Sequence, residues 1–124
     1  MQISDQAKRM LQIAYRTLDD KQGGDIRIID IREISALTDY FVIVHGNNTS
    51  HVQALVEYLT KAFSQEGYPL VQHEGGNHSS WVLLDYGELI VHIFLKEERE
   101  FYNLERIWSD GKELSSQFTT IKDN

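Results

Sequence analysis

The chain has 124 residues, of which 41% are hydrophobic and none is cysteine, so it is long enough to fold as one domain without disulfide bonds. Its 12 basic and 19 acidic residues give a formal net charge of −7, which argues against a nucleic-acid binder, because such proteins concentrate Lys and Arg on one face. It has no apolar run near the roughly 20 residues that span a bilayer and no signal-peptide core at its start, so we expect a cytoplasmic protein without membrane contact.

The first half of the chain predicts a helix, two strands and a second helix. Ser4 can cap the first helix, which should end near Gly23-Gly24. Residues 25–31 alternate as a strand, and the apolar run 40–45 is typical of a central strand covered on both faces. A second helix is expected from residue 50 to about 65. The apolar residues that these helices should bury are Ala7, Met10, Leu11, Ala14, Leu18, Val52, Leu55, Val56, Leu59 and Phe63.

The second half begins with a strand at 70–73 and continues with a predicted β-hairpin. Two β-prone runs flank Tyr86-Gly87, a two-residue turn with Gly second. The predicted cross-strand pairs, counted outward from that turn, are Asp85 with Glu88, Leu84 with Leu89, Leu83 with Ile90, Val82 with Val91 and Trp81 with His92. One face of the hairpin is then wholly aliphatic. The other face carries Trp81 and His92. Because this mixture of aromatic and polar side chains is not typical of a buried core, we expect this face to bind a partner.

A short helix is predicted from about residue 97. The residues that share its apolar side, which should face the core, are Phe101, Leu104 and Trp108. Tyr102 lies off this side, with Arg99 one turn before it. We expect these two to contact a partner, because Trp, Tyr and Arg dominate interface energetics.

The order of the predicted elements is α-β-β-α-β-β-β-α. It describes one α/β (α+β) domain over residues 1–124, with residues 111–124 expected as a loosely ordered tail. The strands should form a mixed five-stranded sheet with helices mainly on one face, which leaves the other face available for binding.

The sequence lacks the residue patterns that are typical of metal-binding and phosphate-binding sites. Residues 73–78 read His-Glu-Gly-Gly-Asn-His, but no second pair of ligands stands at zinc-like spacing and the chain has no cysteine. A solvated loop explains this segment better. The same loop lacks the glycine patterns that cradle phosphates. We therefore expect neither a metal nor a cofactor.

Five stretches of the chain match a known family in order and spacing. Four of them are TDYFVIV at 38–44, EG at 74–75, WVLLDYGELIVHIF at 81–94 and REFYNLERIW at 99–108, and the fifth is the helix beginning near residue 50. From about residue 3 to residue 110 the chain resembles the ribosomal silencing factor family, the Iojap-like proteins of bacteria and organelles. The resemblance implies a nucleotidyltransferase-like fold. It also implies a factor that docks on a protein of the large ribosomal subunit, blocks joining of the small subunit and represses translation when nutrients are short.

The implied partner should be a basic ribosomal protein, with little direct contact to nucleic acid, because residues 74–110 hold eight acidic residues against three basic ones. The candidate partner-binding residues are Asp39, Tyr40, Glu74, Trp81, Leu83, Asp85, His92, Arg99 and Tyr102. A turn or cap explains Thr38-Asp39 about as well as a binding role does, and the family motif adds weight to binding. The apolar face should also pair two copies of the free protein, so we expect a homodimer.

Two other functions remain open at this point. A factor in large-subunit maturation would use the same contact. A nucleotidyltransferase-like enzyme would need an Asp-x-Asp or Asp-x-Glu pair on a strand shortly after a Gly-Ser turn. Here Asn47 and Asn48 follow Gly46, Asp85 stands alone at the hairpin end, and residues 91–94 contain no acid. We therefore expect a protein that is not an enzyme, since fold analogy is a poor guide to function.

Overall fold

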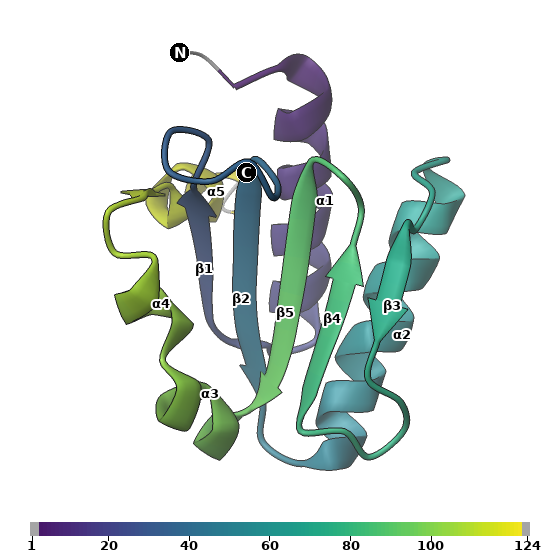
Figure 1. Ribbon diagram of the computed structural model, residues 1–124. Helices are drawn as coiled ribbons and strands as arrows, with labels where there is room; N and C mark the ends of the chain where they lie inside the picture. Colours follow the sequence, from purple (N-terminus) through teal and green to yellow (C-terminus); the bar gives the residue numbers. More distant parts are fainter. Residues whose placement is uncertain (1–2, 123–124) are drawn as a thin grey trace.

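The computed structural model describes residues 3–122, with side chains as far as residue 119, and its centre is one mixed sheet (Figure 1). The elements in chain order are α1 (Asp5–Asp20), β1 (Gly24–Asp30), β2 (Tyr40–Gly46), α2 (Thr49–Gln65), β3 (Gln72–Glu74), β4 (Trp81–Asp85), β5 (Leu89–Leu95), α3 (Lys96–Tyr102), α4 (Leu104–Ile107), β6 (Lys112–Glu113) and α5 (Ser115–Lys122). Within the described residues the sheet has six strands in the order β3-β4-β5-β2-β1-β6. The predicted fold class is confirmed, but the sheet has one strand more than expected, because β6 adds to the edge of β1.

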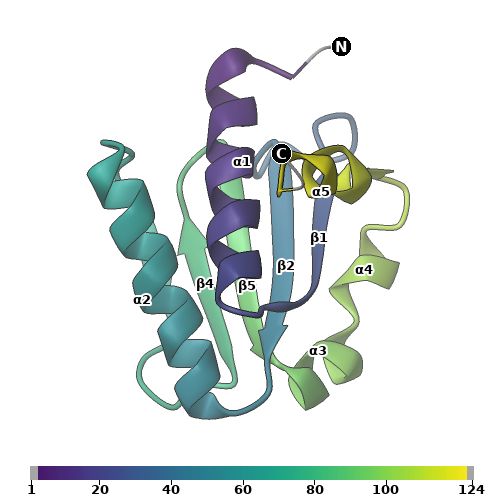
Figure 2. The same ribbon diagram turned by 180° about the vertical axis from the view of Figure 1, so that it is seen from behind.

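Helices α1 and α2 lie side by side on one face of the sheet (Figure 2). The Ser4 hydroxyl caps α1 by accepting a hydrogen bond from the Ala7 N–H (3.1 Å), and the Asn48 side chain caps α2 by accepting from the His51 N–H (2.8 Å). All ten apolar residues that the sequence assigned to the inner sides of these helices are buried in the core. Both predicted helices are therefore confirmed.

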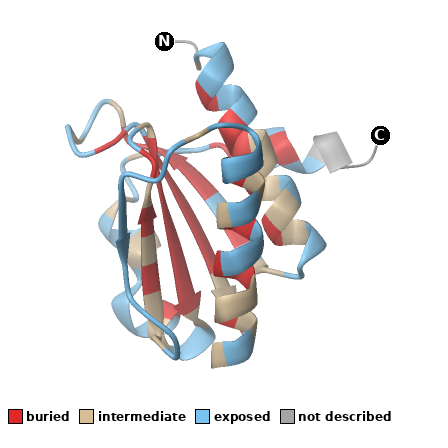
Figure 3. Cartoon of the chain, turned by 90° about the vertical axis from the view of Figure 1, so that its right-hand side faces the viewer, coloured by how far each residue is buried: buried red, intermediate tan, exposed pale blue. Residues whose placement is uncertain are grey.

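Strand β2 lies at the centre of the sheet, antiparallel to β1 and parallel to β5. Its residues 40–44 are all buried. The main core fills the space between the sheet and α1, α2 and α5, and a second, smaller cluster around Phe41, Ile90 and Phe94 lies on the opposite face. Figure 3 shows the buried residues concentrated on the central strands and on the inner sides of the helices. The expected central strand with both faces covered is confirmed.

The register of the hairpin differs from the predicted one by two residues. The observed cross-strand pairs are Trp81 with Phe94, Val82 with Ile93, Leu83 with His92, Leu84 with Val91 and Asp85 with Ile90. The turn is centred on Gly87-Glu88, and the Tyr86 N–H donates to the Leu89 carbonyl oxygen (2.9 Å). This pairing makes glycine the first of the two turn residues rather than the second. Gly87 has φ +86°, whereas Tyr86 is not among the residues with positive φ, as a type I′ turn at Tyr86-Gly87 would require. Because side chains alternate with a period of two, a shift of two residues keeps every side chain on its predicted face.

Replacing Gly87 with Ala should lower the free energy of unfolding by about 1 kcal/mol or more, because an L-residue is strained at this positive φ. Urea denaturation measures the change. Gly76→Ala is the matched control, since Gly76 is also an exposed loop glycine but has no positive φ and has open space where a Cβ would stand. Equal stability of the two variants would contradict the positive φ of Gly87.

The face of the sheet opposite α1 and α2 is only partly covered. Helices α3 and α4 lie along it next to β1 and β2, and Leu104 and Trp108 pack on the second cluster. In the part of the chain that the structure describes, no helix lies over β3 and β4 on this side, and α3 contacts β5, which it follows directly (Figure 1). The expected free face is thus restricted to the half of the sheet that contains the hairpin.

Residues 111–122 do not form the loosely ordered tail that was predicted. Strand β6 pairs with Ile29 and Asp30 of β1, and α5 follows it directly. Leu114 and Phe118 are buried in the main core. These two apolar residues, four positions apart, anchor the segment because their burial offsets the loss of chain entropy. Residues 123–124 of the predicted tail lie outside the described residues.

None of the helices within residues 3–122 combines the length and the apolar character that a membrane span requires.

Candidate functional site

The uncovered half of the sheet presents a surface that we call the open face. It is formed by Gln72 and Glu74 of β3, Trp81, Leu83 and Asp85 of β4, and Phe101 and Tyr102 of α3. Glu74 is the cross-strand partner of Leu83, and Gln72 is the partner of Asp85, so all four side chains lie on the same side of the sheet. The open face therefore has an apolar centre with polar and acidic side chains at its β3 edge.

Trp81 is the aromatic residue at the centre of the open face, and its position is fixed on three sides. Its ring lies 4.9 Å from the ring of Phe94 and 4.9 Å from that of Tyr102, measured between centroids. Its Nε1–H donates a hydrogen bond to Nδ1 of His92 (3.1 Å). Trp81 and His92 thus interact as predicted, but diagonally rather than as direct cross-strand partners. A half-buried indole held in one orientation is ready to bind a partner without further ordering.

His92 supports the open face from beneath and does not form part of it. The side chain is 5% exposed, and its ring packs against Phe41 with centroids 4.8 Å apart. Because Nδ1 accepts from Trp81, the ring must be neutral with its proton on Nε2. Burial lowers the pKa of His92 to about 4, which agrees with that assignment. His92 was expected to contact a partner, and the structure instead makes it the residue that orients Trp81.

His92 should make the stability of the protein depend on pH below neutrality. With a pKa of about 6.5 in the unfolded chain and about 4 in the folded one, the unfolded chain binds the proton more readily. The free energy of unfolding should therefore be highest above pH 6.5 and fall by about 3 kcal/mol between pH 6.5 and pH 4.

Denaturation in urea at several pH values checks this dependence on His92. A His92→Gln variant should lose most of the fall, because it removes the titrating group. His78→Gln should retain it, since His78 is an exposed loop residue. A His92→Gln profile as steep as that of the wild type would contradict the assignment.

Phe101 and Tyr102 form an aromatic wall beside Trp81. Their rings are 5.1 Å apart between centroids, and the side chains are 79% and 43% exposed. Phe101 was predicted to lie in the core with Leu104 and Trp108, and that prediction is wrong. The reason is Asn103, whose left-handed backbone (φ +49°) ends α3 and begins a separate helix, α4. Phe101 therefore does not share one helix face with Leu104 and Trp108. Sequence spacing could not reveal a break of this kind.

Acidic groups line the edge of the open face near the hairpin turn. Glu74 is exposed and accepts a hydrogen bond from the Gln72 amide (2.9 Å). Asp85 is half-buried and accepts from the Gly87 N–H (2.8 Å). Within the open face no Lys or Arg offsets these charges. A complementary surface must therefore supply basic groups.

The predicted site residues Asp39 and Tyr40 differ from each other in exposure. Tyr40 is 1% exposed, and the guanidinium of Arg32 lies 5.3 Å from its ring centroid. It is a core residue, so its expected contact with a partner is not available in this structure. Asp39 is exposed, and its N–H donates to the Glu88 carbonyl oxygen (3.1 Å), which places it beside the acidic edge. Thr38 fixes the loop by donating from Oγ1 to the Gly87 carbonyl oxygen (2.8 Å).

Arg99 is buried rather than exposed, with 5% of its surface accessible. It borders a polar cleft of about 600 Å³, which His45, Asp25 and Glu105 also line. Acidic and basic groups pair with one another across this cleft. Among residues 3–122 there is no group of three or more His, Asp and Glu side chains arranged to hold a metal ion. Arg99 therefore belongs to a structural junction and not to the open face.

Comparison with known proteins gives consistent matches over most of the chain. The family described as "Ribosomal silencing factor during starvation" matches residues 4–124. The ribosomal silencing factor RsfS of Bacillus subtilis is 41% identical over 104 residues, which cover 84% of this chain and 88% of that protein. A mouse protein named "Mitochondrial assembly of ribosomal large subunit protein 1" is 34% identical over 106 residues, covering 83% of this chain and 46% of that protein.

Two solved structures share the fold. A crystal structure of a Chromobacterium violaceum protein has a TM-score of 0.80 at 28% identity and covers 88% of both chains. A crystal structure from Bacillus halodurans has a TM-score of 0.74 at 38% identity, covering 82% of this chain and 94% of that one.

Proposed function

Because this chain belongs to the ribosomal silencing factor family, we propose that its open face binds a basic protein of the large ribosomal subunit. The bound factor occupies the surface where the small subunit joins, and so it represses translation when nutrients are limiting. The relatives are named as silencing or assembly factors and not as enzymes, which supports a protein that acts by binding.

The observation that carries the proposal is the position of Trp81. Aromatic residues in a well-packed setting supply a large share of the energy of protein–protein interfaces. Trp81 is held between Phe94 and Tyr102 at the centre of the open face. Leu83 packs on the same cluster as Trp81, and Phe101 extends the aromatic surface beyond Tyr102. A monomeric protein has little reason to leave such an area exposed unless it binds something.

The charge of the chain supports a protein partner over ribosomal RNA. The acidic edge formed by Glu74 and Asp85 repels phosphate, and the chain as a whole carries −7. The same groups attract a basic protein surface and speed its approach. We therefore propose that direct contact with nucleic acid is small.

A second candidate function is maturation of the large subunit through the same contact. It is favoured by the mouse relative, whose name places that protein in the assembly of the mitochondrial large subunit. Cells that lack the chain distinguish the two functions. Accumulation of precursor large subunits during growth supports maturation, whereas normal subunits that fail to be silenced in starved cells support silencing.

The experiment that tests the main proposal is sedimentation with purified ribosomal subunits. The chain should migrate with large subunits in a sucrose gradient, and its addition before small subunits should reduce the 70S peak. Migration at the top of the gradient would overturn the proposal. Turnover of ATP in the presence of magnesium would instead support the enzymatic alternative.

In the free state we propose that two copies cover their open faces by pairing. The apolar centre favours this association, and the acidic edges limit its strength because like charges repel. Light scattering at low and moderate salt tests it. A dimer should be detected most clearly at moderate salt, and a monomeric mass at high protein concentration would contradict the idea.

A further inference from the structure

The aromatic wall of the open face stands on a helix that is weakly attached to the rest of the protein. Of the seven residues of α3, all of which the structure describes, only Arg99 is buried. The residue before the helix, Leu95, gives it no side-chain cap, and Asn103 ends it in the left-handed conformation. Tyr102 therefore depends on Arg99 for its position against Trp81, and Phe101 packs in turn on Tyr102.

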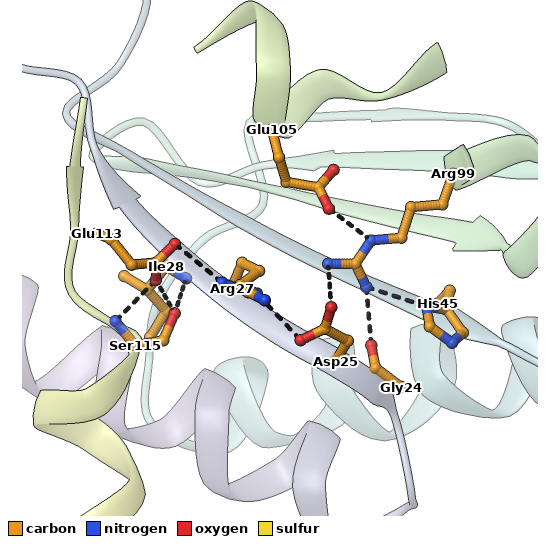
Figure 4. A network of polar contacts seen from close by, with 9 residues as sticks. All are labelled: Gly24, Asp25, Arg27, Ile28, His45, Arg99, Glu105, Glu113 and Ser115. Atoms are coloured by element: carbon orange, nitrogen blue, oxygen red, sulfur yellow. Dashed lines mark hydrogen bonds and ion pairs between the residues drawn. The ribbon is translucent and has the colours of Figure 1, made fainter. Parts of the chain in front are cut away.

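The guanidinium of Arg99 contacts groups from three other elements (Figure 4). It donates to the carbonyl oxygen of Gly24 in β1 (2.9 Å), to Nδ1 of His45 in β2 (3.0 Å) and to Oε2 of Glu105 in α4 (3.1 Å). A carboxylate oxygen of Asp25 lies 3.8 Å from its third nitrogen. One side chain thus fixes α3 to the edge of the sheet and to α4.

Three groups around Arg99 are constrained in protonation, in space or in backbone conformation. His45 must be neutral to accept the hydrogen bond, and its pKa is lowered by burial and by the positive charges of Arg99 and Lys96, while Asp25 and Glu100 act in the opposite sense. A Cβ at Gly24 would overlap the His45 ring, so only glycine fits there. Asp25 has φ +42° at an irregularity in the pairing of β1 with β2. Backbone strain of this kind persists only where its surroundings enforce it.

We propose that Arg99 is a positioning residue for the open face: it touches no partner, and it holds α3 so that Tyr102 lies against Trp81. This inference rests on the proposed function, since the open face is the surface whose shape Arg99 maintains. Loss of the guanidinium frees α3, because the contacts that remain come from half-buried and exposed side chains. Lysine does not replace it, since an ammonium cannot reach four groups in a planar arrangement.

The outer part of the same network supplies a matched control. Arg27 pairs with Asp25 (3.0 Å) and with Glu113 (3.7 Å), but it is exposed and contacts nothing on α3 in the described chain. Exposed ion pairs contribute little to stability. Arg27→Met therefore makes the same chemical change as Arg99→Met without removing the attachment of α3.

The first measurement needs no partner and is therefore independent of the proposed function. Amide hydrogen exchange over residues 96–102 should become at least ten times faster in Arg99→Met, whereas the amides of α1 and α2 should change little. Arg27→Met should leave both regions unchanged. Unaltered protection of residues 96–102 in Arg99→Met would overturn the inference, whatever the protein binds.

The second measurement asks whether Arg99 acts through Tyr102. Arg99→Met should weaken retention on purified large subunits about tenfold. In a Tyr102→Ala background the same change should weaken it less than twofold, because the wall that Arg99 positions is already gone. A full tenfold loss in both backgrounds would mean a general structural role and would overturn the inference. Failure of the wild type to bind large subunits would count against the proposed function alone.

Arg99→Met can prove too unstable to purify. Glu105→Gln is then the second variant, since it retains the size of the side chain and removes one charged acceptor of the guanidinium. It should accelerate exchange over residues 96–102 in the same direction but less strongly. No acceleration at all in Glu105→Gln would contradict the inference.

Discussion

Replacing Trp81 with Ala should weaken binding to the large ribosomal subunit by about 2 kcal/mol or more, roughly 30-fold, while the protein stays folded. The indole fills the centre of the open face, and its half-buried ring is held by Phe94, Tyr102 and His92. Removing it takes away both the apolar contact and the support of the aromatic wall. The main core is untouched, since Trp81 packs on the second cluster and on Tyr102, which lie on the opposite face of the sheet.

Retention on immobilised large subunits, measured over a range of concentrations, gives the change in affinity caused by Trp81→Ala. Tyr58→Ala is the matched control, because Tyr58 is an aromatic residue of α2 that is about as exposed as Tyr102 but lies away from the open face. Its affinity should equal that of the wild type. Equal losses in the two variants would show that binding does not use the open face.

Replacing Phe118 with Ala should lower the free energy of unfolding by about 3 kcal/mol or more. The phenyl ring is buried in the main core together with Leu114, next to residues of α1 and β1. Its removal leaves a cavity that the surrounding side chains fill only in part. The effect would be absent if residues 111–122 were the loosely ordered tail that the sequence suggested.

Urea denaturation followed by circular dichroism measures the stability of the Phe118 variant. Gln117→Ala serves as control, since Gln117 is its exposed neighbour on the same helix and should change stability by less than about 0.5 kcal/mol. A Phe118→Ala protein with wild-type stability would mean that α5 does not belong to the core.

The parts of the fold that the sequence predicted well depend on local rules. Ser4 and the spacing of the apolar residues define α1, and the uninterrupted apolar run of β2 marks a strand covered on both faces. Local rules do not predict the exact position of the hairpin turn. Tyr86-Gly87 and Gly87-Glu88 both give a two-residue turn with Gly87 at positive φ, and only the observed strand pairing decides between them. The face of Trp81 was still predicted correctly, because the two registers differ by an even number of residues.

The parts that were missed depend on contacts between distant segments. Arg99 is buried because it finds acceptors at Gly24 and His45, more than fifty residues earlier in the chain, and nothing near Arg99 signals them. Phe101 was assigned to the core because a continuous helix was assumed through Asn103. The C-terminal segment did carry a signal, since Leu114 and Phe118 stand four positions apart as on one side of a helix.

The parallel pairing of β2 with β5 has a consequence for the order in which the protein forms during its own synthesis. Tyr40 pairs with Leu89, and about 50 residues separate the two strands in the chain. As the chain leaves the ribosome, α1, β1 and β2 emerge first, and one edge of the apolar strand β2 stays unpaired until β5 follows. Contacts between segments so distant slow folding, and an unpaired apolar edge invites association with other chains. The nascent protein should therefore need protection by chaperones most during the interval between synthesis of β2 and release of β5.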